Sequence, residues 1–305
     1  MSINTSIFPK TLTIGTFDGV HLGHQKILKR VLQIADKEKM TPSVLTFFPH
    51  PRMVLHQDKS IKLLNTIAER KLLLEQFGIE LICVKTFTKS FANLSARAYV
   101  KDVLIDELNA KYVVIGYDHK FGKNRSANIN DLNNFSKEFK FQIEEISAKD
   151  IEEVTISSTK IRKALNNGNV SLANIYLGYN YFLTGKVIKG QKIGRTIEFP
   201  TANIYIEEDY KLIPKDGVYI VKSKFDNQIY FGMMNIGSNP TFKNKPRSIE
   251  VHFFDFNTEI YGEKIVVQFL KRIRDEKEFK SIDELKLQLQ NDKNYSKNYI
   301  QSLNE

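Results

Sequence analysis

The first half of the chain alternates between segments with the pattern of a strand and segments with the pattern of a helix. Short apolar or β-branched runs occur at 12–14, 43–48, 81–84 and 112–115, and the stretches between them have helical spacing. Strands that alternate with helices form parallel sheets covered on both faces. The sequence therefore predicts an α/β domain with a doubly wound parallel sheet. Ligands of such sheets bind beyond the carboxyl ends of the strands, so we expect segments 15–24, 46–51 and 116–125 to converge.

The pattern changes after Ser171. Short strand candidates follow at 181–188, 217–225, 229–236, 248–256 and 264–270, with clusters of Gly, Pro, Asn and Asp between them. Short strands at regular spacing without intervening helices indicate an antiparallel sandwich or barrel. A last helix is expected at about 281–290, where apolar residues recur on one helical face. We expect a boundary between Ala164 and Tyr181, with domains at 1–168 and 181–305.

The composition limits the class of protein. With 305 residues, the chain is long enough for two cores. The net charge of +10 is spread along the sequence, which suits anionic small molecules at least as well as nucleic acid. A single cysteine excludes an internal disulfide and suggests a reducing, cytoplasmic compartment. No apolar run approaches 18 residues, so we expect no membrane span.

A glycine-bearing turn joins the first strand to the first helix. It reads Thr-Ile-Gly-Thr-Phe-Asp-Gly-Val-His-Leu-Gly-His-Gln from position 13, and the helix carries His21 and His24. Glycines let the backbone approach a ligand closely, the first helical turn has free N–H groups, and imidazoles add donors or charge. These features predict a phosphate site. A metal pair or two surface histidines is the alternative, although a metal would need further ligands and Cys83 lies in an apolar run.

Three more segments of the first half carry candidate chemistry. The turn at 46–51 contains Pro49 and Pro51, which fix the backbone where a strand ends. The segment at 116–125 follows a buried strand and mixes glycines with Asp118, basic residues and Arg125, which suit ribose hydroxyls and phosphoryl oxygens. Hydroxyl residues and Arg162 open a helix at 156–162, a combination that suits a polyphosphate. A rigid turn, a solvated loop and a plain capped helix are the respective alternatives.

Together these segments resemble the adenylylating module of the bifunctional bacterial riboflavin kinase/FAD synthetase family. That module is a Rossmann-like His-x-Gly-His nucleotidyltransferase, and the resemblance covers about residues 10–165. Its most specific parts are Phe-Asp-Gly-Val-His-Leu-Gly-His-Gln and Ile-Ser-Ser-Thr-Lys-Ile-Arg. It implies that His21 and His24 stabilise the phosphates of ATP. It further implies ATP contacts at Gly15, Phe17, Asp18, Gly23, Asp118, Arg125, Ser158, Thr159 and Arg162, and flavin contacts at Pro49 and Pro51.

In the second half, a basic, glycine-punctuated segment at 185–195 leads into Phe-Pro-Thr-Ala-Asn-Ile. In extended chain, Thr201 and Asn203 project to the same side. A hydroxyl and an amide carbonyl are hard oxygen donors suited to Mg²⁺ that is shared with nucleotide phosphates. An ordinary turn and strand is the alternative.

Glu250 is the candidate for acid–base chemistry. Alternation along Ser-Ile-Glu-Val-His-Phe-Phe places Ile249, Val251 and Phe253 on one face and Glu250 on the other. A carboxylate among aromatic side chains either lies at a strand edge in water or is retained for chemistry.

These segments resemble the riboflavin kinase module of the same family, over about residues 181–305. The matching runs include Gly-Arg-Thr-Ile-Glu-Phe-Pro-Thr-Ala-Asn-Ile, Gly-Met-Met-Asn-Ile-Gly and Glu-Val-His. By this resemblance, Thr201 and Asn203 bind Mg²⁺ and Glu250 is the general base. It also implies nucleotide contacts at Gly185, Gly190, Gly194 and Arg195, and flavin contacts at Asn235 and Arg274.

Two positions depart from the family pattern. Ala127 and Glu198 stand where we expect glycine. At position 127, a requirement for positive φ would strain the loop, and at 198 a carboxylate beside a phosphate loop would repel ATP unless it points outward or pairs with a cation.

The resemblance implies two ATP-dependent steps, from riboflavin to FMN and from FMN to FAD. The expected ligands are small molecules, and we expect neither nucleic acid nor membrane as a partner. One alternative is an enzyme with a single activity whose other module has decayed, with Glu198 or Ala127 as the lesion. Another is a binding protein that senses flavin or nucleotide and touches RNA, although the basic residues form no stripe.

Overall fold

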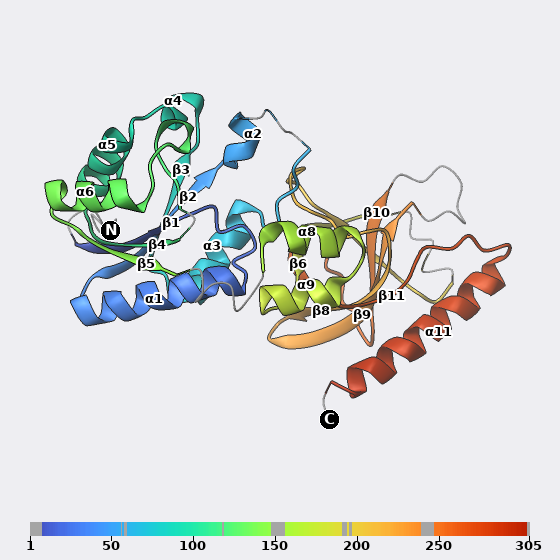
Figure 1. Ribbon diagram of the computed structural model, residues 1–305. Coiled ribbons are helices and arrows are strands. Elements are labelled where there is room, and N and C mark those ends of the chain that lie inside the picture. The colour runs from blue at the N-terminus through green and yellow to red at the C-terminus, as the bar shows by residue number, and fades with distance from the viewer. Residues whose placement is uncertain are drawn as a thin grey trace. The chain divides into compact units, whose positions relative to one another are not determined.

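The first part of the chain forms an open sheet in the computed structural model, which describes residues 8–55, 57, 60–117, 119–147, 156–190, 194, 197–238 and 247–303 (Figure 1). The strands are β1 (Lys10–Ile14), β2 (Thr41–Phe48), β3 (Leu81–Thr86), β4 (Ala110–Gly116) and β5 (Gln142–Ile146). They pair in the order β3-β2-β1-β4-β5, and each pair is parallel. The predicted parallel sheet is confirmed.

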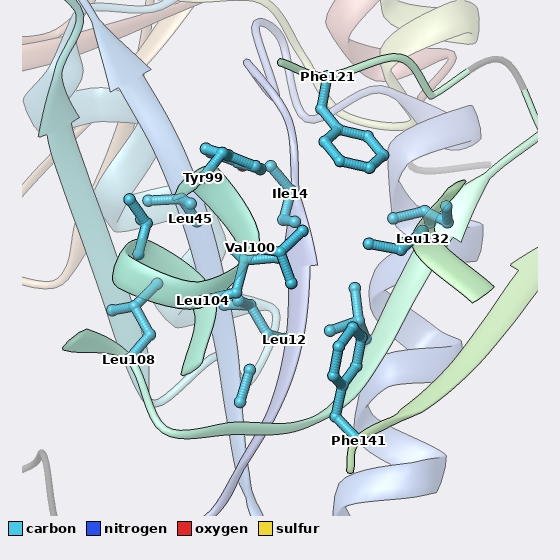
Figure 2. Packing of buried hydrophobic residues seen from close by; sticks show 14 of the residues in the cluster. Leu12, Ile14, Leu45, Tyr99, Val100, Leu104, Leu108, Phe121, Leu132 and Phe141 are labelled. Carbon is cyan, nitrogen blue, oxygen red and sulfur yellow. The ribbon is translucent and has the colours of Figure 1, made fainter. Parts of the chain in front are cut away.

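Helices cover both faces of this sheet. Leu12, Leu45 and Val113 pack on one face against the π-helical segment η1 and α6 (Figure 2). Val44 and Val114 point to the other face, against α1 and α3. Because both faces are apolar, these strands have apolar runs rather than alternation. The helical elements are α1 (Leu22–Glu38), α2 (Pro51–Leu55), α3 (Ile67–Gln76), α4 (Lys89–Ala92), α5 (Ala96–Ala98), η1 (Tyr99–Glu107), η2 (Lys123–Arg125) and α6 (Ile129–Phe139).

The second part of the chain forms a closed antiparallel barrel, as predicted. Its strands pair in the order β10-β7-β6-β11-β8-β9. Two helices precede the barrel, and the long helix α11 follows it (Figure 1). The elements are α8 (Ser158–Asn166), α9 (Val170–Leu177), β6 (Phe182–Ile188), β7 (Ala202–Tyr205), β8 (Gly217–Phe225), β9 (Gln228–Gly237), β10 (Ser248–Phe253), β11 (Lys264–Arg274) and α11 (Ile282–Gln301).

The helix α11 packs on the outside of the barrel through an apolar cluster. Leu285 and Leu289 of the helix contact Phe199, Met233 and Phe254. Lys293 and Lys297 add cation–π contacts to the rings of Phe199 and Phe254. The helix is longer than the expected segment at 281–290. Across the described residues, no helix combines the length and the apolar content needed to cross a bilayer.

The chain divides into two units between Ser158 and Thr159, earlier than the expected boundary at 164–181. The reason is that α8 and α9 belong with the barrel. The backbone N–H of Lys215 donates to Leu165 O (3.0 Å), and the side chain of Asn174 donates to Phe269 O (2.9 Å). We call residues 1–158 the N-terminal unit and residues 159–305 the C-terminal unit.

Candidate active sites

The loop after β1 places two histidines at the start of α1. His21 is the N-cap residue of the helix, and its Nδ1 accepts a hydrogen bond from the backbone N–H of His24 (3.4 Å). The two imidazole rings are stacked, with their centroids 3.7 Å apart. A Cβ added at Gly23 would lie 3.2 Å from the His21 ring. Glycine therefore gives the ring of His21 room to lie against the first helical turn.

His24 is held in its neutral form. Burial is the main cause, and the nearby charges of His21 and Arg70 add to it, so that the pKa of His24 lies well below its usual value. Its Nδ1 is buried and has no hydrogen-bond partner among the described residues. The ring of Phe17 packs against it at a centroid distance of 5.0 Å. A neutral imidazole carries one N–H, so His24 is suited to donate one hydrogen bond.

Two residues of the same loop have an unusual backbone. Phe17 (φ 47°) and Val20 (φ 36°) both have positive φ, which costs free energy in residues with a side chain. Both side chains are buried in the core below the loop, and the N–H of Gly15 donates to Leu45 O of β2 (3.0 Å). Packing therefore holds the loop in a conformation that its residues would not adopt alone.

The side chain of Asp18 holds the loop in place. It is completely buried, and its carboxylate accepts hydrogen bonds from the backbone N–H groups of Leu64 (3.1 Å) and Asn65 (3.2 Å). The guanidinium of Arg70 lies 3.7 Å away. Because these donors occupy the carboxylate, the side chain of Asp18 holds the loop, and a contact of Asp18 with ATP stays a prediction.

Ser158 lies against the histidine loop, although 140 residues separate it from Asp18. Its Oγ donates to Asp18 O (2.9 Å). This contact brings the start of the 156–162 segment to the segment that contains His21 and His24. Thr159 is exposed and Arg162 is half-buried on α8, within the C-terminal unit, and their contact with ATP remains a prediction.

A cavity of about 600 Å³ lies where the strands of the N-terminal unit end. Ile14 of β1, Phe47 of β2 and Pro51 of α2 line it together with residues 119–122, 124 and 125. Segments 46–51 and 116–125 thus meet at one cavity, as predicted, whereas β1 contributes Ile14, which lies one residue before segment 15–24. That segment meets the end of β2 through the hydrogen bond from Thr46 Oγ1 to Thr16 O (3.0 Å). The walls are aromatic, with Phe47, Phe87, Phe91, Tyr99 and Phe121, and the basic residues at the cavity are Arg52, Lys89, Lys120 and Arg125.

Of three other residues singled out from the sequence in this region, the structure describes two. Pro49 follows a cis peptide bond at the end of β2. Asp118 lies outside the described residues. Ala127 pairs with Phe121 through two backbone hydrogen bonds of 3.1 Å and is not among the residues with positive φ. Positive φ falls instead on Asn124 and Arg125, so alanine at 127 does not strain the loop.

In the barrel, Glu250 lies in a row of polar side chains across three strands. It pairs in register with Asn203 of β7 on one side and with Asn235 of β9 on the other. The neighbours of Glu250 along β10, Ile249 and Val251, are buried while Glu250 is half-buried, so the predicted alternation is confirmed. Side chains that face the same way at paired positions are close neighbours.

Hydroxyl groups orient the carboxylate of Glu250. Thr201 Oγ1 lies 3.2 Å from Glu250 Oε2, and Ser248 Oγ lies 2.9 Å from Glu250 Oε1. Each oxygen thus accepts one hydrogen bond from a hydroxyl. Thr201, Asn203 and Glu250 form a set of hard oxygen donors, the type that Mg²⁺ prefers.

Two glycines of the segment that leads to β7 make close contacts. A Cβ at Gly190 would overlap the side-chain amide of Asn203, and a Cβ at Gly194 would overlap the carbonyl of Phe199. Both positions therefore need glycine next to the residues that precede and form β7. Gly185 differs, because it is buried inside β6, where a Cβ would collide with Ile204. We assign Gly185 to strand packing rather than to phosphate binding. Arg195 lies outside the described residues.

The two expected flavin contacts of the barrel have partners within the protein. The side-chain amide of Asn235 donates to Glu276 Oε1 (3.1 Å). Arg274 makes a bidentate ion pair with Asp292 of α11, in which Nε donates to Oδ1 (3.1 Å) and Nη2 donates to Oδ2 (2.7 Å). Since Asp292 is buried and takes up the guanidinium fork, Arg274 anchors α11, and its contact with a flavin stays a prediction.

A second cavity, of about 340 Å³, adjoins Thr201 in the C-terminal unit. Ala202 and Val251, which pair in register, form part of its wall. Residues 256–261 close it on another side, with Phe256, Asn257 and Glu259 among them.

Several residues of these sites were not predicted. Arg70 and the aromatic residues Phe87, Phe91 and Tyr99 lie far in sequence from the motifs. Residues 256–261 form a loop without a periodic pattern. The sequence signal for Arg70 is weak: it lies between two charged residues, although Ile67, Leu73 and Leu74 share its face of the helix. A charged run of this kind also fits a solvated helix face.

Comparisons with known proteins give consistent matches in both halves. A family model described as FAD synthetase matches residues 5–160, and one described as riboflavin kinase matches residues 177–300. A bifunctional riboflavin kinase/FMN adenylyltransferase from Bacillus subtilis is 42% identical over 300 residues, which are 96% of this chain and 93% of the relative. The enzyme of the same name from Escherichia coli is 34% identical over 282 residues, 92% of this chain and 90% of that one.

A solved structure supports the fold over nearly the whole chain. It is named a macrolide-efflux protein from Streptococcus pneumoniae, is 35% identical, and covers 95% of this chain and 94% of its own, with a TM-score of 0.84. That name concerns the other protein, and the likeness bears here on the fold. The resemblance drawn from the motifs is confirmed by the two family models and the named relatives. The chain belongs to the family of bifunctional riboflavin kinase/FMN adenylyltransferases.

Proposed function

We propose that the two activities of this family are divided between the two units of the chain. Riboflavin is phosphorylated beside Glu250 in the barrel, and FMN is adenylylated beside His21 and His24 in the N-terminal unit. The observation that carries the proposal is the polar row of Asn203, Glu250 and Asn235 across three paired strands, with Thr201 on the carboxylate.

In the kinase step, Glu250 accepts the proton of the riboflavin 5′-hydroxyl. The hydroxyl oxygen forms a bond to the γ-phosphorus of ATP, the bond to the β-phosphate oxygen breaks, and ADP leaves. A base is useful because the nucleophile is a neutral alcohol, and such assistance contributes about 10²–10⁴-fold. The hydroxyl groups of Thr201 and Ser248 support this role, since they hold the carboxylate in one orientation.

Thr201 and Asn203 would hold Mg²⁺ in this site. Their oxygen atoms match the preference of the ion, which when bound neutralises charge on the phosphates of ATP. The cavity of about 340 Å³ beside Thr201 is where we place the base of the nucleotide, because its wall is partly apolar and includes Thr201, one of the two proposed metal donors.

In the adenylyl transfer, a phosphate oxygen of FMN attacks the α-phosphorus of ATP, and pyrophosphate leaves. No protein base is needed, since a phosphomonoester with a second pKa of about 6 is already an anion near neutral pH. His21, His24 and the start of α1 would stabilise the triphosphate, and a well-placed donor contributes about 3–4 kcal/mol to the transition state.

The aromatic cavity of the N-terminal unit is where we place the flavin. Its walls offer faces for an isoalloxazine ring to stack on, and its basic residues suit the phosphate of FMN. Arg125 at the cavity fits the second of these roles.

One assay tests the proposal. The full chain is incubated with riboflavin, ATP and Mg²⁺, and the products are separated by chromatography. We expect FMN first and FAD afterwards. Accumulation of FMN without FAD, or conversion of supplied FMN without any conversion of riboflavin, would indicate a decayed module. Binding without turnover would indicate a sensing protein.

A further inference from the structure

Arg70 is an arginine that the fold buries behind the histidine loop. Its side chain is 1% exposed, on α3. A guanidinium keeps its charge at any physiological pH, and taking it out of water is costly unless it is paired. The partners of Arg70 therefore indicate what its burial achieves.

These partners come from two segments that lead into the proposed adenylylation site. Nη1 donates to Thr46 Oγ1 (3.2 Å) and to Phe47 O (3.4 Å), at the end of β2. Nη2 lies 3.7 Å from Asp18 Oδ1, in the histidine loop. One planar group thus joins the loop after β1 to the strand end that lines the aromatic cavity.

Further hydrogen bonds extend this network. Thr46 Oγ1 donates to Thr16 O (3.0 Å), two residues before Asp18. The carboxylate of Asp18 accepts from the backbone that precedes α3, and the N–H of Gly19 donates to Asn65 Oδ1 (2.8 Å). The loop is therefore tied to β2 and to the start of α3 on both sides of Asp18.

We propose that Arg70 is a positioning residue for adenylyl transfer. Through Asp18 and Thr46 it fixes the loop that carries His21 and His24 relative to the cavity that receives the flavin. The proposal rests on the function assigned above to the histidine site. It explains why a charged side chain is buried at a place where an apolar side chain would pack. The guanidinium can donate to the end of β2 while it pairs with Asp18 in the histidine loop, whereas an apolar side chain could do neither.

The charge of Arg70 also affects His24. The charged or titratable groups here are His21 on α1, Arg70 on α3 and Asp18 in the loop, while Glu69 binds the backbone at the start of α3. The cation opposes a second positive charge on His24. Removal of the charge should therefore raise the pKa of His24, whereas a lysine in its place should not.

The experiment compares Arg70→Met and Arg70→Lys in the full chain. Both variants lose the fork, so kcat for conversion of FMN to FAD should fall about 100-fold, because small displacements at a reacting centre have effects of that size. In Arg70→Met but not in Arg70→Lys, the acidic limb of the pH profile of kcat for FAD formation should move to higher pH. Phosphorylation of riboflavin in the other unit should stay within about twofold, and circular dichroism reports on the folding of the variants.

Two further variants provide controls. Arg30→Met removes another arginine of the N-terminal unit, one that pairs with Glu144 at the surface, and should change neither activity. Thr46→Val removes the hydroxyl between Arg70 and Thr16, whereas Thr46→Ser keeps it. We expect Thr46→Val to slow FAD formation about tenfold and Thr46→Ser to restore it to within about threefold.

The outcomes separate the two proposals. If the wild-type chain forms no FAD from FMN, the proposed function fails. If it does, and Arg70→Met or Arg70→Lys keeps FAD formation within about threefold, only the role of Arg70 is overturned. If both Arg70 variants are unfolded, the threonine pair decides, since equal rates for Thr46→Val and Thr46→Ser would contradict the proposal.

Discussion

The hydroxyl of Thr201 lies 3.2 Å from Glu250 Oε2, so the residue that precedes β7 holds a carboxylate in the middle of β10. The contact links a proposed metal donor to the proposed base. A change at either residue therefore alters both the binding of the nucleotide and the activation of the alcohol.

Glu250→Gln should suppress FMN formation while conversion of FMN to FAD survives. The amide cannot accept the proton of the 5′-hydroxyl, and we expect a loss of about 10²–10⁴-fold in kcat for the kinase step. Each half-reaction is measured separately by chromatography. Glu263→Gln, which changes an exposed carboxylate just before β11, is the matched control. Equal loss of both steps would show that the units are not separate catalysts.

His24→Ala should have the opposite effect, so that riboflavin is converted to FMN and the reaction stops there. Loss of one well-placed donor costs about 10²–10³-fold in rate. The measurement is the FMN and FAD content over time. Unchanged FAD output would contradict the assignment of the histidine loop to the phosphates of ATP.

The N-terminal unit should become less stable in mild acid because of His24. Its pKa in the folded protein lies well below the usual value, so between these two values the unfolded chain binds a proton that the folded chain does not. Stability therefore falls as the pH falls from the usual pKa of histidine toward the pKa of His24 in the folded protein. Hydrogen exchange in β1 and α1 measures this change. The loss of stability in acid should be smaller in His24→Asn. An equal dependence of stability on pH in the variant and the wild-type chain would contradict the prediction.

Glu198→Gly should stabilise the protein and tighten ATP binding in the kinase step. Glu198 has φ 66° and is exposed, so glycine would relieve about 1 kcal/mol of backbone strain and remove a negative charge beside the glycine-rich loop. Thermal unfolding and the KM for ATP are the measurements. Asp226→Gly, at φ 44° in the turn between β8 and β9, should stabilise without changing KM. An unchanged KM for ATP in Glu198→Gly would show that the carboxylate of Glu198 does not repel ATP.

Arg274→Met should destabilise the C-terminal unit by about 3–5 kcal/mol, because it leaves the buried Asp292 without its cation. The loss would first loosen α11. Urea unfolding followed by circular dichroism measures it. In the double variant Arg274→Met/Asp292→Leu the charge is gone as well, and most of the stability should return. A double variant as unstable as the single one would show that the ion pair is not the cause.

The elements that could be predicted are those whose burial leaves a pattern in the sequence. The central strands of the sheet are apolar throughout because helices cover both faces. The edge strand β5 has only two apolar residues among five and was missed. The helix α11 was expected to end near 290, because the sequence loses its apolar period there. Contacts to the barrel by Asp292, Lys293 and Lys297 continue it to Gln301.

The residues of the sites could likewise be predicted only where a local sequence pattern sets their position. Thr201, Asn203 and Glu250 could be predicted because the period of a strand sets which way they face. Arg70 could not, since its partner Thr46 is 24 residues away and only the folded sheet brings them together. The resemblance to the family implied ligand contacts at Asp18 and Arg274, but it could not predict their ion pairs with Arg70 and Asp292, which only the folded chain brings together.

Closure of the barrel has a consequence for how the kinase site tolerates sequence change. Every strand is hydrogen-bonded on both sides, so no strand can slide by one residue without breaking two ladders at once. A slide of β10 by one position would turn Glu250 into the apolar interior and bring Val251 out. Insertions in the turn between β8 and β9, which contributes no residue to the cavity beside Thr201, should therefore leave the chemistry intact, whereas a single inserted residue within β10 should abolish it.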